Sequence, residues 1–240
     1  MSDPENKNDK NFYEAYALFK IGAAWPGYES GFEKFEQPDW INPERSIGLE
    51  VVQGITDTEG QFRAVTNSVL GTTLSDINDN EEVFLEDNCL IGTQNSEKND
   101  RIQLHDSLAQ IIDRPSQVIR ATSLGKELGD ANAYVPTVVS AIRKKLEKLN
   151  MNYINNRENH LAVLMGTAID DSEFVEDIAH QTLVLYLEYR LRFNLVFLIY
   201  QWSVSRLMFS HQHFEIERIG VSSRAQTETI ERTRRYAFGN

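Results

Sequence analysis

The amino-acid sequence predicts an α/β fold in which a mixed central sheet is flanked by helices. Two continuous apolar runs, residues 160–165 and 195–200, are typical of strands that are buried on both faces of a sheet. A strongly apolar helix is predicted between them, at residues 173–191, and Asp170, Asp171 and Ser172 can cap its first turn. A short hairpin earlier in the chain supplies further strands of the predicted sheet.

The chain begins with a polar stretch and continues into a helix. Residues 1–10 are expected to be disordered, and they lack the apolar segment of a signal peptide. Aromatic and aliphatic residues recur at helical spacing over residues 11–21, which predicts a helix that ends at the glycine- and proline-containing segment 22–27. This leading helix carries Glu14.

Two short strands follow, and each of them carries one carboxylate. The first strand, at residues 37–41, contains Asp39, and the second, at residues 47–53, contains Glu50. Residues 42–46 form the turn that joins them into a hairpin.

The register of this hairpin can be calculated from the position of its turn. If the turn is centred between Glu44 and Arg45, residues whose numbers add up to 89 face each other, and Asp39 then faces Glu50. Their Cβ atoms would lie ~5 Å apart. Two like charges at this distance repel, which favours a cation between them or a proton on one of them. A turn of different length would move the pair out of register.

The middle of the chain is predicted to contain two helices and an insertion. A helix is expected at residues 57–71, followed by a polar, loop-rich insertion at about residues 75–115 that is rich in acidic side chains. Pro136 is predicted to open an amphipathic helix that ends near Tyr153. Lys145 lies on the apolar stripe of this helix, so its side chain is expected to face inward.

The C-terminal part is predicted to close the sheet. Residues 204–209 and 214–219 alternate in polarity, which indicates edge strands or a closing hairpin. Residues 221–240 form a basic tail, either a polar helix or a loosely ordered segment. We therefore expect a single domain at residues 11–220, interrupted by the insertion.

Composition and charge narrow the functional classes. The 240 residues carry a net charge of −12, and residues 1–100 alone hold 7 Lys+Arg against 20 Asp+Glu. Such a charge opposes non-specific nucleic-acid binding, although local patches and a bound cation matter more than the total. The single cysteine, Cys89, fits a reducing compartment, and no apolar run is long enough to span a membrane. A cytoplasmic protein is expected.

The leading helix and the hairpin together carry a family resemblance. The leading helix with Glu14, the Pro-Asp dipeptide that ends in Asp39, and the apolar strand around Glu50 resemble the PD-(D/E)xK nuclease superfamily. The resemblance covers roughly residues 11–55 and 137–200, and it implies a restriction-endonuclease-like core.

The resemblance implies an Mg²⁺-dependent or Mn²⁺-dependent endonuclease whose substrate is DNA. Asp39 and Glu50 would be the metal ligands, and the backbone carbonyl of Val51 would be a third. Glu14 would hold a second ion or a metal-bound water. The metal would bind the scissile phosphate and lower the pKa of the attacking water.

One position departs from the family pattern. A lysine is expected two residues beyond the glutamate, and Val52 stands there instead. Gln53 points to the opposite face of the strand. Some families with this fold supply the lysine from the neighbouring helix, and Lys145 is our prediction for that role, with Lys148 as the next choice.

Two alternatives remain open from the sequence. The first is a chemically silent module with the same fold, which the missing strand lysine favours. It could bind a protein partner through its acidic surface, because residues 1–100 and the insertion are rich in carboxylates. His211 and His213 have the i, i+2 spacing of strand metal ligands, but they are also typical of a surface pair without an acidic partner.

Overall fold

The computed structural model of the protein describes residues 4–55, 89–93, 102–103, 119–123, 131–152, 156–165, 170–210 and 213–239. The chain forms two compact units, Met1–Ile55 with Ala131–Asn240, and Thr56–Asp130. A unit is therefore inserted into the other, as the sequence suggested, but its bounds are wider than residues 75–115.

The inserted unit contains a small antiparallel sheet. Its strand β4 (Cys89–Thr93) lies between β5 (Ile102–Gln103) and β6 (Ile119–Ser123). The prediction of a loop-rich insertion missed these strands, because each has five residues or fewer and a short alternation does not stand out from polar surroundings. The helix predicted at residues 57–71 lies outside the described residues.

The larger unit is built on a mixed sheet of seven strands, which confirms the predicted α/β class. Its strand order is β1-β2-β3-β7-β8-β9-β10, in which β3, β7 and β8 are parallel and the other neighbours are antiparallel. The strands are β1 (Glu33–Lys34), β2 (Trp40–Asn42), β3 (Ile47–Gln53), β7 (Glu158–Leu164), β8 (Leu195–Ile199), β9 (Ser203–Phe209) and β10 (Phe214–Gly220). The two buried strands and the closing hairpin of β9 and β10 were predicted correctly.

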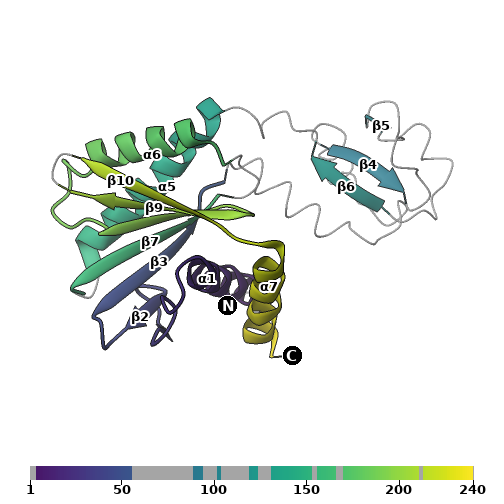
Figure 1. The fold of residues 1–240 in the computed structure, drawn as a ribbon, viewed down its shortest axis with the longest axis horizontal. Helices are drawn as coiled ribbons and strands as arrows, with labels where there is room; N and C mark the ends of the chain where they lie inside the picture. Colours follow the sequence, from purple (N-terminus) through teal and green to yellow (C-terminus); the bar gives the residue numbers. More distant parts are fainter. Residues whose placement is uncertain are drawn as a thin grey trace. The chain divides into compact units, whose positions relative to one another are not determined.

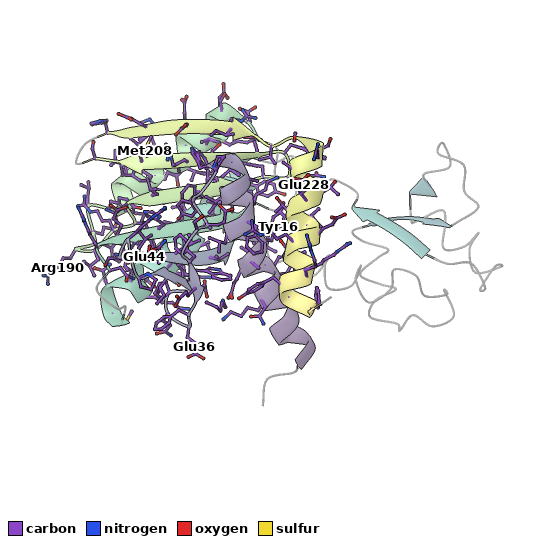
Figure 2. All side chains as sticks on the ribbon, turned by 60° about the horizontal axis from the view of Figure 1, so that its bottom comes forward. Tyr16, Glu36, Glu44, Arg190, Met208 and Glu228 are labelled. Atoms are coloured by element: carbon purple, nitrogen blue, oxygen red, sulfur yellow. The ribbon has the colours of Figure 1, made fainter. Side chains whose placement is uncertain are left out.

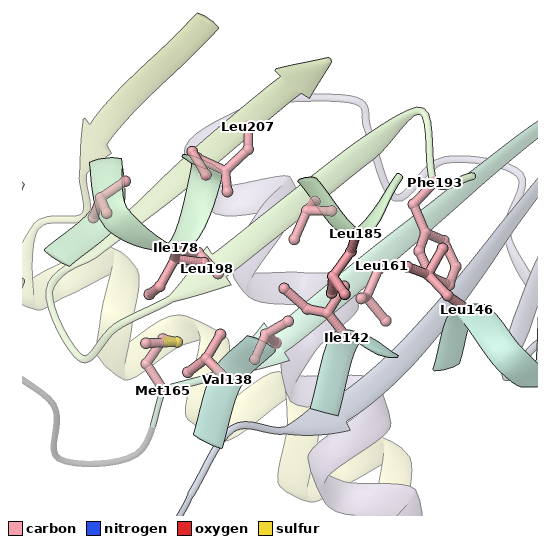
Figure 3. Close-up of a cluster of buried hydrophobic side chains, with 14 of the residues drawn as sticks. Val138, Ile142, Leu146, Leu161, Met165, Ile178, Leu185, Phe193, Leu198 and Leu207 are labelled. Carbon is pink, nitrogen blue, oxygen red and sulfur yellow. The ribbon is translucent and has the colours of Figure 1, made fainter. Parts of the chain in front are cut away.

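Helices cover both faces of this sheet. In Figure 1, α5 (Ala131–Asn152) and α6 (Ser172–Leu185) lie on one face, and α1 (Pro4–Ala24) and α7 (Ser223–Phe238) lie on the other. Each pair encloses its own hydrophobic core with the sheet. The core beneath α5 and α6 includes Ile142, Leu161 and Leu198, none of which is exposed to solvent (Figure 3). No helix among the described residues is long and apolar enough to cross a membrane.

The leading helix is longer than predicted. Helix α1 begins at Pro4, so residues 4–10 are helical, and the expected disorder of residues 1–10 is wrong for them. Proline is favoured in a first helical turn, where an N–H group would have no partner. Lys10 also pairs with Glu14 one turn later, at 3.4 Å, which is a stabilising i, i+4 contact.

Two other helix boundaries also differ from the predictions. Helix α5 begins at Ala131 instead of Pro136, because burial of Tyr134 and Val135 holds the preceding turn against the core. Helix α6 ends at Leu185 instead of residue 191, and its N-cap is Asp171. The hydroxyl of Tyr186 donates to the Phe193 carbonyl at 3.0 Å, which stabilises the turn back into the sheet.

The predicted basic tail is an ordered helix. Helix α7 runs beside α1 in Figures 1 and 2, and its buried face consists of Gln226, Thr229 and Thr233. Both threonine hydroxyls donate to backbone carbonyls within the helix. Because these buried residues are polar, they do not mark the inner face of the helix as apolar side chains would, and the sequence left the segment open between a helix and a loose tail.

Side chains of α1 bind this polar face. The Gln226 side-chain amide donates to the Tyr16 hydroxyl at 2.9 Å and accepts from Lys20, which also donates to the Gln201 carbonyl at 2.8 Å. Lys20 is fully buried, and burial lowers its pKa to about 8. Figure 2 shows Tyr16 beside α7, as these bonds require.

We expect Ser222→Ala to lower the free energy of unfolding by about 1 kcal/mol, because its side chain accepts the Ala225 N–H as the N-cap of α7. The neighbouring exposed Ser223 is the matched control, since no such cap is lost in Ser223→Ala. Urea unfolding of both variants measures the difference. An equal stability of the two variants would show that the cap contributes nothing.

Candidate functional site

The hairpin has the predicted register. Trp40 faces Leu49, and Ile41 faces Gly48, so the numbers of facing residues add up to 89. Asp39 directly precedes β2, and the same register places it opposite Glu50, which lies within β3. The two carboxylates are therefore brought together by local chain geometry alone.

The Asp39 side chain binds the backbone of β3 where a neighbouring strand would otherwise supply a carbonyl. Its Oδ2 accepts the backbone N–H of Val51 at 2.8 Å, although β2 itself begins only at Trp40. The N–H and C=O of a strand residue point to the same edge of the strand, so the Val51 carbonyl is also directed to the side of Asp39. Asp39 and Glu50 are each 5% exposed.

Helix α5 contributes a lysine to the pair. The Lys145 ammonium forms an ion pair with Oε1 of Glu50, and its side chain is 15% exposed. The buried residues Ile142, Leu146 and Leu149 fix the orientation of the helix against the sheet. The predicted inward position of Lys145 is therefore what the structure has.

The other lysines of α5 do not share this position. Lys144 and Lys148 are both exposed, and Lys148 was the second choice for the lysine of the site. The second carboxylate oxygen of Glu50, Oε2, is buried and has no hydrogen-bond partner in the described part of the chain.

Glu14 lies on the flank of the pair, on α1. Its backbone carbonyl accepts the indole N–H of Trp40 at 3.1 Å, which joins the leading helix to the hairpin. Its carboxylate is buried and pairs with Lys34 of β1 and with Lys10. The ammonium of Lys34 also lies over the Trp40 ring, 5.0 Å from its centroid.

Sequence reasoning missed Lys10 and Lys34. Lys10 was assigned to a disordered N-terminus, and strand β1 has only two residues, which is too short to show a pattern. The i, i+4 spacing of Lys10 and Glu14 was the one signal that could have placed Lys10 on the helix.

Asp39 is a buried carboxylate whose pKa is strongly raised. Burial, followed by the charges of Glu50 and Glu14, raises the pKa of Asp39 to about 7, while the Val51 N–H and Lys145 oppose the shift. The pKa of Lys10 is also raised: its partial burial would lower it, but the charges of Glu14, Asp39 and Glu50 prevail. The three carboxylates therefore act as one electrostatic cluster.

The cluster has an unequal distribution of cations. Lys145 pairs with Glu50, and Lys10 and Lys34 pair with Glu14. Asp39 has no lysine or arginine partner among the residues that the structure describes. Asp39 is thus the position at which an additional positive charge would relieve the most repulsion.

The donor atoms fit a hard divalent cation. Asp39, the free Oε2 of Glu50 and the Val51 carbonyl are all oxygen donors, which Mg²⁺ prefers. Over the described ranges, no three His, Cys, Asp or Glu side chains form a complete ligand group. Mg²⁺ is commonly held by only one or two carboxylates, with waters and substrate phosphates as its other ligands.

His213, one residue of the predicted histidine pair, makes a contact within its own turn. His213 Nδ1 lies 2.6 Å from the Ser210 hydroxyl at the start of β10, and the ring makes a local turn contact. His211 lies outside the described residues. The alternative of a histidine metal site therefore remains a prediction.

Comparisons with protein-family models, with curated proteins and with solved structures found no match for this chain.

Proposed function

We propose that this protein is an Mg²⁺-dependent or Mn²⁺-dependent nuclease that hydrolyses phosphodiester bonds in DNA. One observation carries the proposal: two buried carboxylates face each other across a hairpin, and a lysine from a distant helix reaches one of them. The resemblance of the hairpin to the PD-(D/E)xK superfamily supports the same chemistry, with the lysine moved from the strand to Lys145.

Each residue of the site has a distinct part in the proposed reaction. Asp39, Glu50 and the Val51 carbonyl would hold the cation, which would supply Lewis-acid chemistry: binding of the scissile phosphate and a lowered pKa of water. The Lys145 ammonium orients the attacking water or offsets the negative charge that develops on the phosphate. Glu14 holds its flanking lysines near the substrate and can orient a second ion or water.

The proposal is tested by incubating the full chain with plasmid and with labelled oligonucleotides, in Mg²⁺, in Mn²⁺ and in EDTA. Cleavage is expected with either metal and should stop in EDTA. If the same products form in EDTA, the reaction does not use the proposed metal site, and the assignment would be abandoned.

Lys145→Ala is expected to lower metal-dependent cleavage about 10²-fold, because one electrostatic donor to the reacting group is lost. Lys144→Ala and Lys148→Ala are matched controls on the same helix, since both side chains are exposed. Initial rates at saturating metal measure the effect. Equal loss in all three variants would indicate a general weakening of α5 instead of a role for Lys145.

A second candidate is a chemically silent module that binds a protein partner. It is favoured by the pairing of Lys145 with Glu50, which already neutralises one carboxylate without any metal. Isothermal titration with Mg²⁺ and Mn²⁺ separates the candidates. Metal binding that is lost in Glu50→Ala supports the nuclease, and absence of binding in the wild-type chain supports the module.

A further inference from the structure

The end of helix α7 places exposed aromatic rings beside the carboxylate cluster. Tyr236 and Phe238 are each 46% exposed. Tyr236 packs against Trp40, with ring centroids 5.5 Å apart, and Trp40 in turn donates to the Glu14 carbonyl. Burial, and then the nearby charge of Glu14, raise the pKa of Tyr236, so the ring lies within electrostatic range of the Glu14 carboxylate.

The second ring is anchored on the leading helix. Phe238 lies against Phe12 of α1, with ring centroids 6.1 Å apart. Phe12 also stacks on Tyr16 of the same helix, with ring centroids 6.4 Å apart. Phe238 therefore packs on α1 and Tyr236 packs on the hairpin, while nearly half of each residue remains exposed to solvent.

Basic side chains lie on the helix that carries these rings and on the elements next to it. Arg234 and Arg235 are exposed in the last turns of α7, at i, i+4 and i, i+3 spacing from Phe238. Neither has an acidic partner among the residues that the structure describes, whereas Arg232 is already bound to Glu29 at 3.2 Å. Lys10 and Lys34 lie on the Glu14 side of the same region.

We call Tyr236, Phe238, Arg234, Arg235, Lys10 and Lys34 the aromatic–basic rim. The rim stands out against the composition of the larger unit, which holds 18 Lys+Arg against 22 Asp+Glu. The carboxylate cluster repels a polyanion such as DNA. The lysines and arginines of the rim lie next to that cluster, and their positive charge can attract the polyanion to it.

We infer that the aromatic–basic rim binds single-stranded DNA and guides it to the carboxylate cluster. This inference rests on the proposed function and adds the substrate class. Exposed rings can stack on unpaired bases, whose faces are covered in a duplex, and the neighbouring arginines and lysines can contact the phosphates. An overhang or an unpaired end of a longer DNA offers the same chemistry.

The test is equilibrium binding of the full chain to a fluorescein-labelled oligo(dT) of about 20 nucleotides, in EDTA, by fluorescence anisotropy. A length of this order exceeds the site size of a single strand-binding module. We expect the single strand to bind at least tenfold more tightly than a duplex of the same length. Tighter binding of the duplex, or of oligo(U), would overturn the assignment to single-stranded DNA.

Variants separate stacking from packing. Phe238→Leu keeps an apolar contact with Phe12 but loses the ring, and it should weaken binding about 5- to 20-fold. Trp202→Leu removes an aromatic side chain that is 53% exposed at a different turn, between β8 and β9, and it is the matched control. Equal affinities of Phe238→Leu and wild type would overturn the inference.

The arginines are tested through salt dependence. Each phosphate contact contributes about 0.7 to the slope of log affinity against log salt for single strands. The double variant Arg234→Gln/Arg235→Gln should therefore reduce this slope by about 1.4. Arg224→Gln, at the opposite end of α7 and paired with Glu228, should leave the slope unchanged. An unchanged slope in the double variant would contradict the inference that the rim contacts the phosphates of DNA.

These binding results are independent of catalysis. Ring-dependent binding without any Mg²⁺-dependent cleavage would overturn the nuclease and leave the rim in place. Cleavage by a protein whose ring and arginine variants bind DNA like the wild type would overturn the rim and leave the nuclease in place.

Discussion

Replacing Asp39 or Glu50 with alanine is expected to lower Mg²⁺-dependent DNA cleavage by about 10³-fold or more. Each carboxylate would supply an oxygen ligand to the proposed cation from a buried position, and water cannot readily replace that ligand there. Glu50→Ala also releases Lys145 from its ion pair. Initial cleavage rates at several Mg²⁺ concentrations measure the loss.

The matched controls for this prediction are carboxylates of the same hairpin region. Glu36 and Glu44 are exposed, and Figure 2 shows both at the surface of the larger unit. Glu36→Ala and Glu44→Ala should therefore keep wild-type rates. Metal-dependent cleavage that survives both Asp39→Ala and Glu50→Ala would place the active site elsewhere in the chain.

Asp39→Asn is expected to stabilise the metal-free protein at pH 8 by about 2 to 4 kcal/mol relative to wild type. The pKa of Asp39 is about 7 in the folded protein and near 4 in the unfolded chain, so the folded state holds this proton more tightly. The free energy of unfolding therefore falls as the pH rises from about 4 through 7, where the folded protein loses the proton. Asparagine carries no charge and can still accept the Val51 N–H.

Urea unfolding in EDTA at pH 5 and pH 8 measures this effect. The gain in Asp39→Asn should shrink toward pH 5, where Asp39 of the wild type is mostly protonated in the folded state. Glu44→Gln, which removes an exposed carboxylate, should show no such pH dependence. A gain that is equal at both pH values would mean that repulsion at Asp39 does not limit stability.

Local sequence predicted the parts of the site that lie close together along the chain. The two carboxylates are eleven residues apart, and the register of a short hairpin follows from its turn. Lys145 was found by helical periodicity, because it lies on the otherwise apolar stripe that packs on the sheet. Its partner Glu50 is 95 residues away, and the sequence could only propose that contact.

Other parts left no pattern in the sequence. Strand β1, which carries Lys34, is too short for alternation to appear, and the buried residues of α7 are polar, so they do not identify its inner face. The placement of α7 depends on Gln226 reaching Lys20 and Tyr16 across more than 200 residues of chain. Such contacts are selected by the packed core and not by local propensity.

The sequence by itself thus determined an α/β protein with two facing carboxylates, because strand period and turn length act over a few residues. Only the tertiary structure decided how these charges are balanced. Among the residues that the structure describes, it assigned Lys145 to Glu50, gave Glu14 two lysines, left Asp39 without one, and set the end of α7 beside them. The physical reason is that a pKa and an ion pair depend on burial and distance in space, which chain separation does not reveal.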